Sequence, residues 1–452
     1  MKKIVALALA LCMMATLAVA SAETTKLTAW TFIAQHQEYY EGMAEKWNAL
    51  HPDEQIEIEV TTLGYDDMHN KMKVALQSDQ GAPDACDVEL GQFPNILAFN
   101  DKLVELDSYI EPLKDQIVEA RLQIYSKDGK YYGMPLHVGA MVAYYRVDLL
   151  EKAGVDYTAI KTWDDWFEAG KKVKEATGAW MGTVETSTQW VATLMLGQQG
   201  TDWQKDGEVL VNTPEVAKVV DTQKKWLEAG IAEVCPGGQP DTEEGKAYIA
   251  NNDIASVIMP FWYMSRFTGE IGEVRANQYV IAPCPVFEEG QIRSVGAGGT
   301  GTVIYKNGAN ADLAARFFTY AKISDEGNRY VWDVLGFDPV NKAVWEDEAL
   351  MKNEENAFNK YFVGYPVDGL LQIKDEIGAT LSNSLSPTIN SYIDGTLWNE
   401  VYVDMADTAE ALEAAQEADG RLLPHPLPVS FPRMRGKGAL PKWQILCADN
   451  GA

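Results

Sequence analysis

Strand-like and helix-like segments alternate along this chain of 452 residues, and that order constrains its fold more than any other feature. Residues 26–32 and 83–90 read as strands, and residues 56–60 alternate apolar and acidic side chains at the period of a strand. Between these segments, apolar side chains recur at helical spacing in residues 39–50 and 68–76. A β-α-β-α-β order predicts parallel strands joined by crossover helices, and therefore an α/β fold.

Two later helices carry explicit start signals. Thr162 followed by Asp165 has the spacing of a capping box, and Gly178 is the expected end of that helix. Thr213 followed by Pro214 has the pattern of a cap and a first helical residue. Both signals predict where the helices begin without reference to any other part of the chain.

The N-terminus has the order of a secretory signal peptide. Two lysines precede an apolar run, and the small residues Ala20–Ala22 end it. We expect residues 1–22 to be removed, which leaves an exported protein in the periplasm or at the cell surface, and not an integral membrane protein. The alternative is a membrane anchor, but the run is near the short end for a spanning helix. Leu11 stands before Cys12 where a lipoprotein signal has Gly or Ala, so lipid anchoring is left open.

The charge balance excludes one class of partner. The formal net charge is −28, and such a surface repels nucleic acid and anionic lipid while it is indifferent to neutral ligands. We therefore expect no nucleic-acid partner.

Catalytic and metal-binding signatures are missing from the sequence. It has no G-x-S-x-G, no H-E-x-x-H and no P-loop, and its five histidines are dispersed. The cysteines after Ala22 form no C-x-x-C, so neither a zinc site nor a dense disulfide framework is predicted, and their pairing stays open. We expect no cofactor and no metal. Paired carboxylates of a glycoside hydrolase remain an alternative, because such pairing is spatial and the chain has 66 acids.

A glycine motif in residues 293–306 first suggests a nucleotide site. Gly296, Gly298 and Gly301 spell G-x-G-x-x-G. A dinucleotide loop must follow a strand and open a helix, because the pyrophosphate sits on the helix N-terminus. Here the strand-like segment TVIYK follows, so the motif opens a strand and the dinucleotide interpretation fails.

Several segments, in order, resemble one protein family. They read GAPDACDVELGQF, GKYYGMPLHVGAMVAYYRVDLLEKAGVD, TWDDW, VIAPCPVFEEG with the glycine loop, and ISDEGNRYVW. Together they are similar to the extracellular solute-binding proteins (family 1) of carbohydrate ABC importers, relatives of maltose-binding protein. The resemblance covers residues 26–419. The runs TFIAQHQEYYEGMAEKWN, PLHVGA and RSVGAGGTGT resemble members that bind lactose, arabinose or arabino-oligosaccharides.

The resemblance implies a type II periplasmic-binding-protein fold, with two α/β lobes and the ligand in the cleft between them. The implied partners are a neutral sugar or oligosaccharide and the transmembrane subunits of an ABC permease, and the protein is expected to be a monomer. The implied segments are residues 23–136 and 286–335 in lobe 1, and residues 137–285 and 336–419 in lobe 2, the last ending in C-terminal helices.

Sugar chemistry indicates which residues of the implied cleft are candidates. The C–H face of a sugar packs on aromatic rings, and its hydroxyls need planar polar partners or backbone amides. The ligand-binding candidates are Trp30, His36, Glu89, His137, Glu185, Trp190, Trp262, Tyr263, Arg293, Gly298 and Gly299. Each has a structural alternative: a core aromatic, a satisfied histidine, a surface ion pair or a bare hinge turn.

The predicted function is capture of a sugar and its delivery to a permease, without catalysis. The alternatives are a secreted glycoside hydrolase, or a binding protein for a non-sugar solute such as a polyamine. Residues 420–452 differ from the rest, being basic and rich in proline, so we predict disorder there, and a frameshifted C-terminus is a further hypothesis.

Overall fold

The computed structural model describes residues 24–422, except residues 206, 381 and 384. The predicted signal peptide and residues 423–452 of the basic tail lie outside the described residues. The first residues of that tail, 420–422, belong to a helix, in contrast to the predicted disorder. None of the helices in the described part of the chain combines the length and the apolar character needed to cross a membrane.

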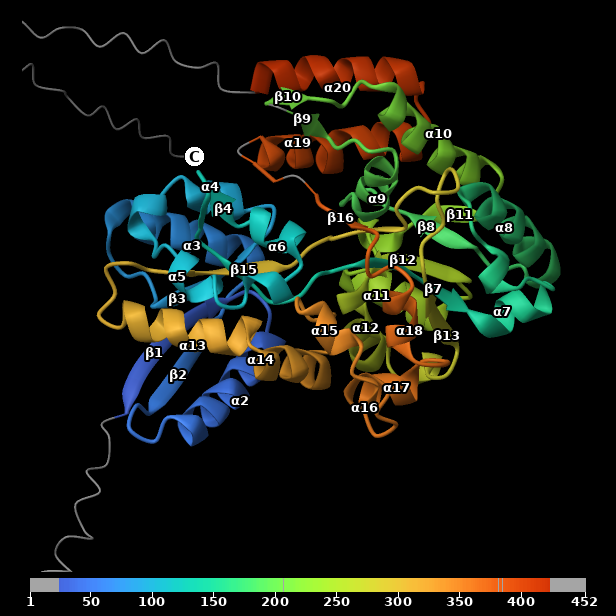
Figure 1. The fold of residues 1–452 in the computed structure, drawn as a ribbon. Coiled ribbons are helices and arrows are strands. Elements are labelled where there is room, and N and C mark those ends of the chain that lie inside the picture. The colour runs from blue at the N-terminus through green and yellow to red at the C-terminus, as the bar shows by residue number, and fades with distance from the viewer. Residues whose placement is uncertain (1–23, 206, 381, 384, 423–452) are drawn as a thin grey trace, which may run out of the picture.

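Lobe 1 is built around a five-stranded sheet in the order β2-β1-β3-β15-β6 (Figure 1). β1 pairs with β2 and β3 in parallel, as the alternation predicted, whereas β15 runs antiparallel to β3. The strands are β1 (Thr25–Thr31), β2 (Ile56–Thr62), β3 (Ala85–Glu89), β6 (Met134–Pro135) and β15 (Thr300–Ile304). The motif that contains Gly298 thus leads into strand β15, as predicted.

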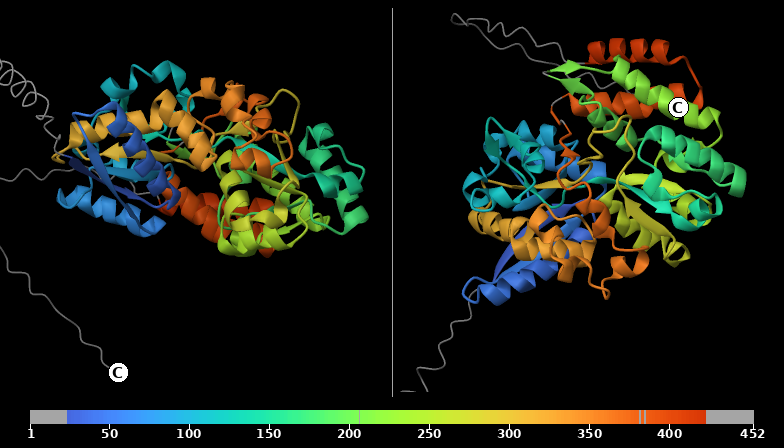
Figure 2. Two further views of the ribbon diagram at one scale, coloured as in Figure 1. Left: turned by 90° about the horizontal axis from the view of Figure 1, so that it is seen from below. Right: turned by 45° about the vertical axis from the view of Figure 1, so that its right-hand side comes forward.

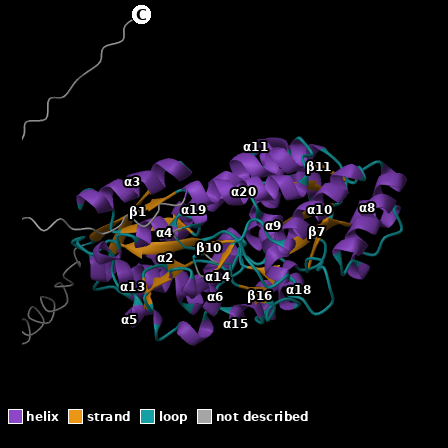
Figure 3. Ribbon diagram, turned by 90° about the horizontal axis from the view of Figure 1, so that it is seen from above, coloured by secondary structure: helices purple, strands orange, loops and turns teal. Residues whose placement is uncertain are grey.

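Helices flank this sheet on both faces (Figure 3). Helix α2 packs its buried Tyr39, Tyr40, Met43 and Trp47 against the sheet and α13. The helices of lobe 1 are α2 (Gln35–Leu50), α3 (Tyr65–Ser78), α4 (Phe93–Leu97), α5 (Asp107–Ile110), α6 (Glu119–Gln123), α13 (Ala311–Ile323), α14 (Asp325–Tyr330) and the π-helix η8 (Val331–Leu335), and a hairpin is formed by β4 (Ser126–Lys127) and β5 (Lys130–Tyr131).

Lobe 2 is built around a three-stranded antiparallel sheet in the order β12-β7-β13. Its strands are β7 (Met141–Arg146), β12 (Ser256–Pro260) and β13 (Tyr279–Ala282), and smaller pairs are formed by β8 (Gly182–Val184) with β11 (Ala232–Val234) and by β9 (Gln204–Lys205) with β10 (Glu208–Val209). Its helices are α7 (Val147–Lys152), α8 (Trp163–Thr177), α9 (Trp190–Gln198), α10 (Pro214–Glu228), α11 (Glu243–Asn251), the 3-10 helix η5 (Phe261–Tyr263), α12 (Met264–Arg266) and the π-helix η6 (Phe267–Ile271).

The predicted caps of lobe 2 are confirmed. Thr162 and Asp165 exchange both hydrogen bonds of a capping box, and Gly178 ends α8 in the left-handed conformation. The Thr213 hydroxyl accepts from Val216 N at the start of α10, with Pro214 as first residue. These helices begin where they do because side chains satisfy their first free amides.

The C-terminal helices pack mainly on lobe 2, and the first of them also contacts α14 of lobe 1 (Figure 2). Helix α20 packs on α10 and α19, on the far side of α9 from the sheet in Figure 1. These elements are α15 (Lys342–Trp345), α16 (Glu348–Met351), α17 (Ala357–Tyr361), α18 (Pro366–Leu371), α19 (Ser386–Tyr392), the π-helices η9 (Ile393–Leu397) and η10 (Asn399–Val403), and α20 (Thr408–Leu422), and β16 (Ile377–Gly378) pairs with β14 (Ser294–Val295).

Three crossing segments join the lobes: residues 136–140, 296–299 and 336–341. They bond to one another, because Ala297 N donates to Gly139 O at 2.8 Å and Val138 N donates to Asp338 O at 2.9 Å. Apolar side chains of the first and third segments belong to one buried cluster with residues of both lobes, whereas Ala297 of the second segment belongs to the cluster of lobe 2. The lobes therefore share packing along a bonded bridge, and the site lies beside it.

Candidate ligand-binding cleft

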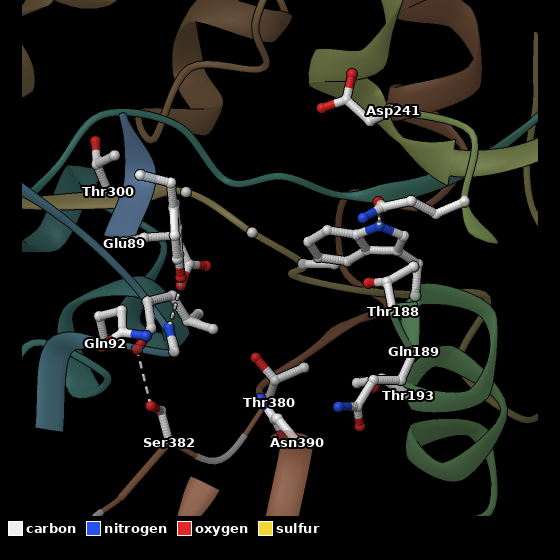
Figure 4. Close-up of a pocket in the computed structure, with 18 of the residues that line it drawn as sticks. Glu89, Gln92, Thr188, Gln189, Thr193, Asp241, Thr300, Thr380, Ser382 and Asn390 are labelled. Atoms are coloured by element: carbon white, nitrogen blue, oxygen red, sulfur yellow. Dashed lines mark hydrogen bonds between the residues drawn. The ribbon is translucent and has the colours of Figure 1, made fainter. Parts of the chain in front are cut away.

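A cavity of about 860 Å³ lies between the two lobes. This volume is typical of pockets that hold a small ligand. Loops after β1 and β3 form the lobe 1 wall, the start of α9 and the segment from Gln239 to Arg266 form the lobe 2 wall, and the C-terminal segment from Thr380 to Asp394 closes one side. Figure 4 shows Glu89 and Gln92 facing Thr188, Gln189 and Thr193 across open space.

Two indoles from different elements form the aromatic part of the lobe 2 wall. Trp190 begins α9 and Trp262 follows β12, and their rings meet edge to face with centroids 5.9 Å apart. Trp190 Nε1 donates to Gln239 Oε1 at 3.3 Å and Trp262 Nε1 donates to Ala297 O at 3.1 Å. With their polar atoms bonded inside the chain, the rings present a fixed apolar surface to the cavity.

The glycine loop packs directly on these rings. Gly298 has φ +66°, and a Cβ atom there would lie 3.1 Å from Trp262 Nε1 and 3.4 Å from a carbon of the Trp190 ring. Gly299 has φ +107°, and a Cβ atom there would lie 2.4 Å from an Arg121 nitrogen. Arg121 Nη2 donates to Gly298 O at 2.6 Å. Only glycine fits both positions, since each needs a left-handed backbone and a close neighbour.

Glu89 closes the lobe 1 wall at the end of β3. One of its oxygens accepts from Tyr65 Oη at 2.9 Å and from Gly91 N at 2.6 Å. Burial raises the pKa of its carboxyl above the ordinary value, against the effect of these two donors. The carboxyl is thus held in place at the carboxyl end of a strand, where α/β sheets place ligands.

His137 lies in the first crossing segment and lines the cavity. Its ring contacts Phe337 edge to face at 4.7 Å, and neither ring nitrogen has a hydrogen-bond partner within the described chain. Burial lowers the pKa of His137 well below the ordinary value, and the nearby Arg121 lowers it further. A neutral imidazole offers one donor and one acceptor, so both needs of this ring are open to a bound molecule.

A charged group forms the far end of the lobe 2 wall. Arg266 binds Asp241 through two hydrogen bonds, of 2.7 and 3.3 Å, and its guanidinium lies 5.4 Å from the centre of the Trp262 ring. Lys246 pairs with Glu243 at 2.8 Å. The two cations of this wall are therefore neutralised by acids of the same lobe.

The structure brings six of the eleven predicted residues together in the cavity lining: Glu89, His137, Trp190, Trp262, Gly298 and Gly299. It places the other five elsewhere, each with a partner of its own. Arg293 forms an ion pair with Glu376 at 2.6 Å and lines a separate, smaller cavity of about 210 Å³. Trp30 lies under the Lys71 ammonium at 4.0 Å.

The remaining three residues are buried behind the lining. His36 is fully buried and its Nδ1 lies 2.8 Å from Asp87 Oδ2, inside a lobe 1 network. Tyr263 donates to Pro240 O at 2.7 Å. Glu185 accepts from Val191 N at 3.1 Å at the start of α9. Trp262, which is next to Tyr263 in the sequence, and Trp190, five residues after Glu185, both reach the cavity. The side chains of His36, Tyr263 and Glu185 are instead buried within the lobes.

Several lining residues had no signal in the sequence. They are the polar side chains Gln92, Gln189, Asp241, Arg266, Asn390 and Asp394. Asn390 and Asp394 come from the C-terminal segment, which the sequence pattern assigned only to closing helices. Their sequence spacing from Gln189 gives no sign that they share a site with it, because they come close to Gln189 only in the folded protein.

Metal chemistry finds no support at this site. Among the described residues, no three His, Cys, Asp or Glu side chains are arranged to hold a metal ion. The described cysteines, Cys86, Cys235 and Cys284, are buried free thiols and lie outside the cavity lining.

Comparison with known proteins identifies the family. The family model for bacterial extracellular solute-binding proteins matches residues 33–325. The arabinooligosaccharide-binding protein of Halalkalibacterium halodurans is 39% identical over 396 residues, 87% of this chain and 88% of that protein. The protein of the same name from Bacillus subtilis is 39% identical over 390 residues, 83% of this chain and 89% of that one.

A solved structure agrees with the fold. The sugar-binding protein MalE from Xanthomonas citri superposes with a TM-score of 0.73 at 17% identity, covering 88% of this chain and 97% of that one. Its likeness supports the two-lobe architecture that the sheets and crossing segments define. From the family match and the shared architecture, this chain belongs to the bacterial extracellular solute-binding protein family.

Proposed function

We propose that this protein captures a neutral oligosaccharide between its lobes, as the substrate-binding component of an ABC importer. The observation that carries the proposal is the cavity wall itself: two fixed indoles lie next to buried polar atoms that have no hydrogen-bond partner among the described residues. A sugar needs both surfaces, rings for its C–H face and planar polar groups for its hydroxyls.

The polar groups that meet this need lie around the rings. We propose His137, Gln189 and Asp394 as hydroxyl partners, because each has a buried nitrogen or oxygen that forms no hydrogen bond within the described part of the chain. Glu89 and Gln92 face Gln189 from lobe 1 (Figure 4). Leaving such atoms unpaired costs about 1–3 kcal/mol each, so a ligand that pairs them is favoured.

The relatives narrow the sugar class. Two proteins at 39% identity are named as arabinooligosaccharide-binding, over more than four-fifths of each chain. We propose an arabino-oligosaccharide as the ligand. The cavity is large enough for more than one sugar ring, in line with pocket volumes of about 300–1,000 Å³ for small ligands.

Capture follows from ligand contacts on both lobes. A ligand that touches both walls stabilises the arrangement in which the lobes close on it, and so shifts the population towards that state. The permease subunits then recognise the closed form. In this proposal the protein acts as an exported monomer, does not turn over its ligand, and has lobe boundaries near residues 136, 285 and 335.

A thermal-shift panel tests the proposal. Arabino-oligosaccharides, other oligosaccharides and polyamines are added to the purified protein, since a ligand stabilises the folded state by RT ln(1 + [L]/Kd). We expect stabilisation by arabino-oligosaccharides that grows with concentration. If a polyamine stabilised the protein and no sugar did, the ligand would be an amine and the proposed sugar ligand would be wrong. Turnover of a glycoside that the Glu89→Gln variant loses would make the protein a hydrolase.

A further inference from the structure

Two polar side chains from distant parts of the chain meet at the lobe 2 wall without satisfying their hydrogen bonds. Gln189 precedes α9 and is only 8% exposed, yet neither its amide oxygen nor its amide nitrogen has a hydrogen-bond partner in the residues that the structure describes. Asp394 lies in η9 and its Oδ1 is buried without a partner. The amide lies beside the carboxyl, but the two groups do not meet in hydrogen-bond geometry. Both residues line the cavity.

A third carboxyl lies behind this pair. Glu185 follows β8 and is 4% exposed. Its Oε2 accepts from Val191 N at 3.1 Å, which ties it to the first turn of α9, while its Oε1 has no partner. Asp394 is close enough to act on it electrostatically. Glu185 does not line the cavity, so it acts on the site only through Asp394 and through the start of α9.

We propose that Gln189 and Asp394 form a hydroxyl-binding subsite whose affinity is linked to a proton on Asp394, with Glu185 as the positioning residue behind it. The inference rests on the proposed function, because the group that binds at this subsite is a sugar hydroxyl. The ionised carboxylate accepts the hydroxyl hydrogen, and the Gln189 amide donates to the hydroxyl oxygen. Charge-assisted hydrogen bonds of this kind are stronger than neutral ones.

Buried surroundings raise the pKa of the carboxyls at this subsite, so a bound ligand can change the protonation of Asp394. Burial raises the pKa of Asp394 to about 7. Burial also raises the pKa of Glu185 to about 8, with the Asp394 carboxylate as a further cause, so ionisation of Asp394 favours the protonated form of Glu185. Among the described residues, Tyr402 of η10 and Cys235 after β11 also interact with Glu185, and burial raises the pKa of both, which keeps them neutral.

Sugar binding and protonation of Asp394 oppose each other. A hydroxyl that donates to the ionised carboxylate stabilises the charged form of Asp394, so binding lowers its pKa and releases a proton near neutral pH. Affinity then rises with pH through 7. A downward shift of about one pH unit on binding makes the affinity about fivefold weaker at pH 6 than at pH 8.

Calorimetric titration of the purified full chain with arabinotriose tests this. It is run at pH 6, 7 and 8, and at pH 7 in two buffers with different protonation enthalpies, which reports protons released on binding. We expect the wild-type protein to release about 0.4 protons per bound ligand at pH 7, and to bind about fivefold more weakly at pH 6 than at pH 8. The Asp394→Asn variant should bind with a flat pH profile and no proton release.

Two further variants separate the roles. The Asp404→Asn variant changes an exposed carboxyl outside the cavity lining and should keep the wild-type profile. The Glu185→Gln variant keeps a neutral side chain at that position and should retain the proton release near pH 7. A pH dependence that survives in Asp394→Asn and disappears in Glu89→Gln would assign the linkage to lobe 1 and overturn the inference. A sugar that binds with the same affinity at all pH values overturns the inference but leaves the proposed function standing, whereas no binding at any pH overturns the proposed function.

Discussion

The Asp338 carboxyl joins two of the three crossing segments, since its Oδ2 accepts from Ala140 N at 2.7 Å. Its Oδ1 accepts from Gly139 N at 3.1 Å, and the side chain is fully buried. Asp338 therefore joins the third crossing segment to the first through its side chain, whereas the glycine loop joins the first through the backbone bond from Ala297 N to Gly139 O. Burial raises the pKa of Asp338 to about 7, against the effect of the two amide donors.

This raised pKa predicts a pH-dependent stability. Between its unfolded value near 4 and its folded value near 7, Asp338 is protonated in the folded state and ionised in the unfolded state. Its contribution to stability is therefore present at low pH and lost as pH rises to 7. The Asp338→Asn variant lacks this titration, so its deficit relative to the wild type should be larger at pH 5 than at pH 8, by about 2–3 kcal/mol. Urea unfolding at the two pH values measures it, and an equal deficit at both contradicts it.

Removal of one indole should weaken sugar binding more than it changes the fold. Trp190 is half-buried and contributes the exposed part of the aromatic wall. We expect Trp190→Ala to raise Kd for an arabino-oligosaccharide about thirtyfold, for a loss of about 2 kcal/mol of apolar contact. Trp180→Ala is the matched control, because Trp180 is also half-buried but packs under Lys174 outside the cavity lining. An equal affinity loss in both variants would mean that the effect is indirect.

Sugar binding should depend on glycine at position 298 because of the neighbouring indoles, and not only because the backbone turn needs a glycine. Gly298→Ala and Gly154→Ala both place a side chain at positive φ, of 66° and 64° respectively, which costs about 1 kcal/mol in each. Only at Gly298 would the new Cβ meet Trp262 and Trp190, whereas the space beside Gly154 is open. Titration calorimetry should show weaker sugar binding in Gly298→Ala alone. If both variants bind like the wild type, the loop acts only as a hinge.

A buried ion pair should stabilise lobe 1. Lys322 Nζ lies 3.4 Å from Asp87 Oδ1, and both residues are at most 1% exposed. The Lys322→Met variant leaves the Asp87 charge without this partner, so we expect it to lose about 3–5 kcal/mol of unfolding free energy. Adding Asp87→Asn should recover part of the loss, because it removes the unpaired charge. Guanidinium unfolding measures both variants, and a single variant as stable as the wild type contradicts the expectation.

The parts of the fold that local sequence determines were predicted, and the parts that depend on long-range packing were not. The parallel pairing of β1 with β2 and β3 follows from alternation, and the cap at Thr162 follows from the spacing of neighbouring residues. Leu50 shows the limit of periodicity: it continues the apolar face of α2 but is 58% exposed, because it is the last residue of the helix.

The site residues likewise fall into a group that the sequence could predict and a group that it could not. Trp262 and Glu89 follow strands, and Gly298 belongs to a loop that opens one, so their places near the cleft could be inferred from the order of elements. Gln189 and Asp394 could not, since they meet only after the C-terminal segment packs on α9. Neighbours in sequence can also point in opposite directions, as Trp262 and Tyr263 do.

Sugar capture is tested most directly by calorimetric titration of the wild-type protein with arabinotriose, beside spermidine and a buffer blank. We predict saturable binding of one arabinotriose per chain and no heat of binding with spermidine. No binding of arabinotriose or any longer arabino-oligosaccharide, together with saturable binding of spermidine, would contradict the assignment of this cleft to a sugar.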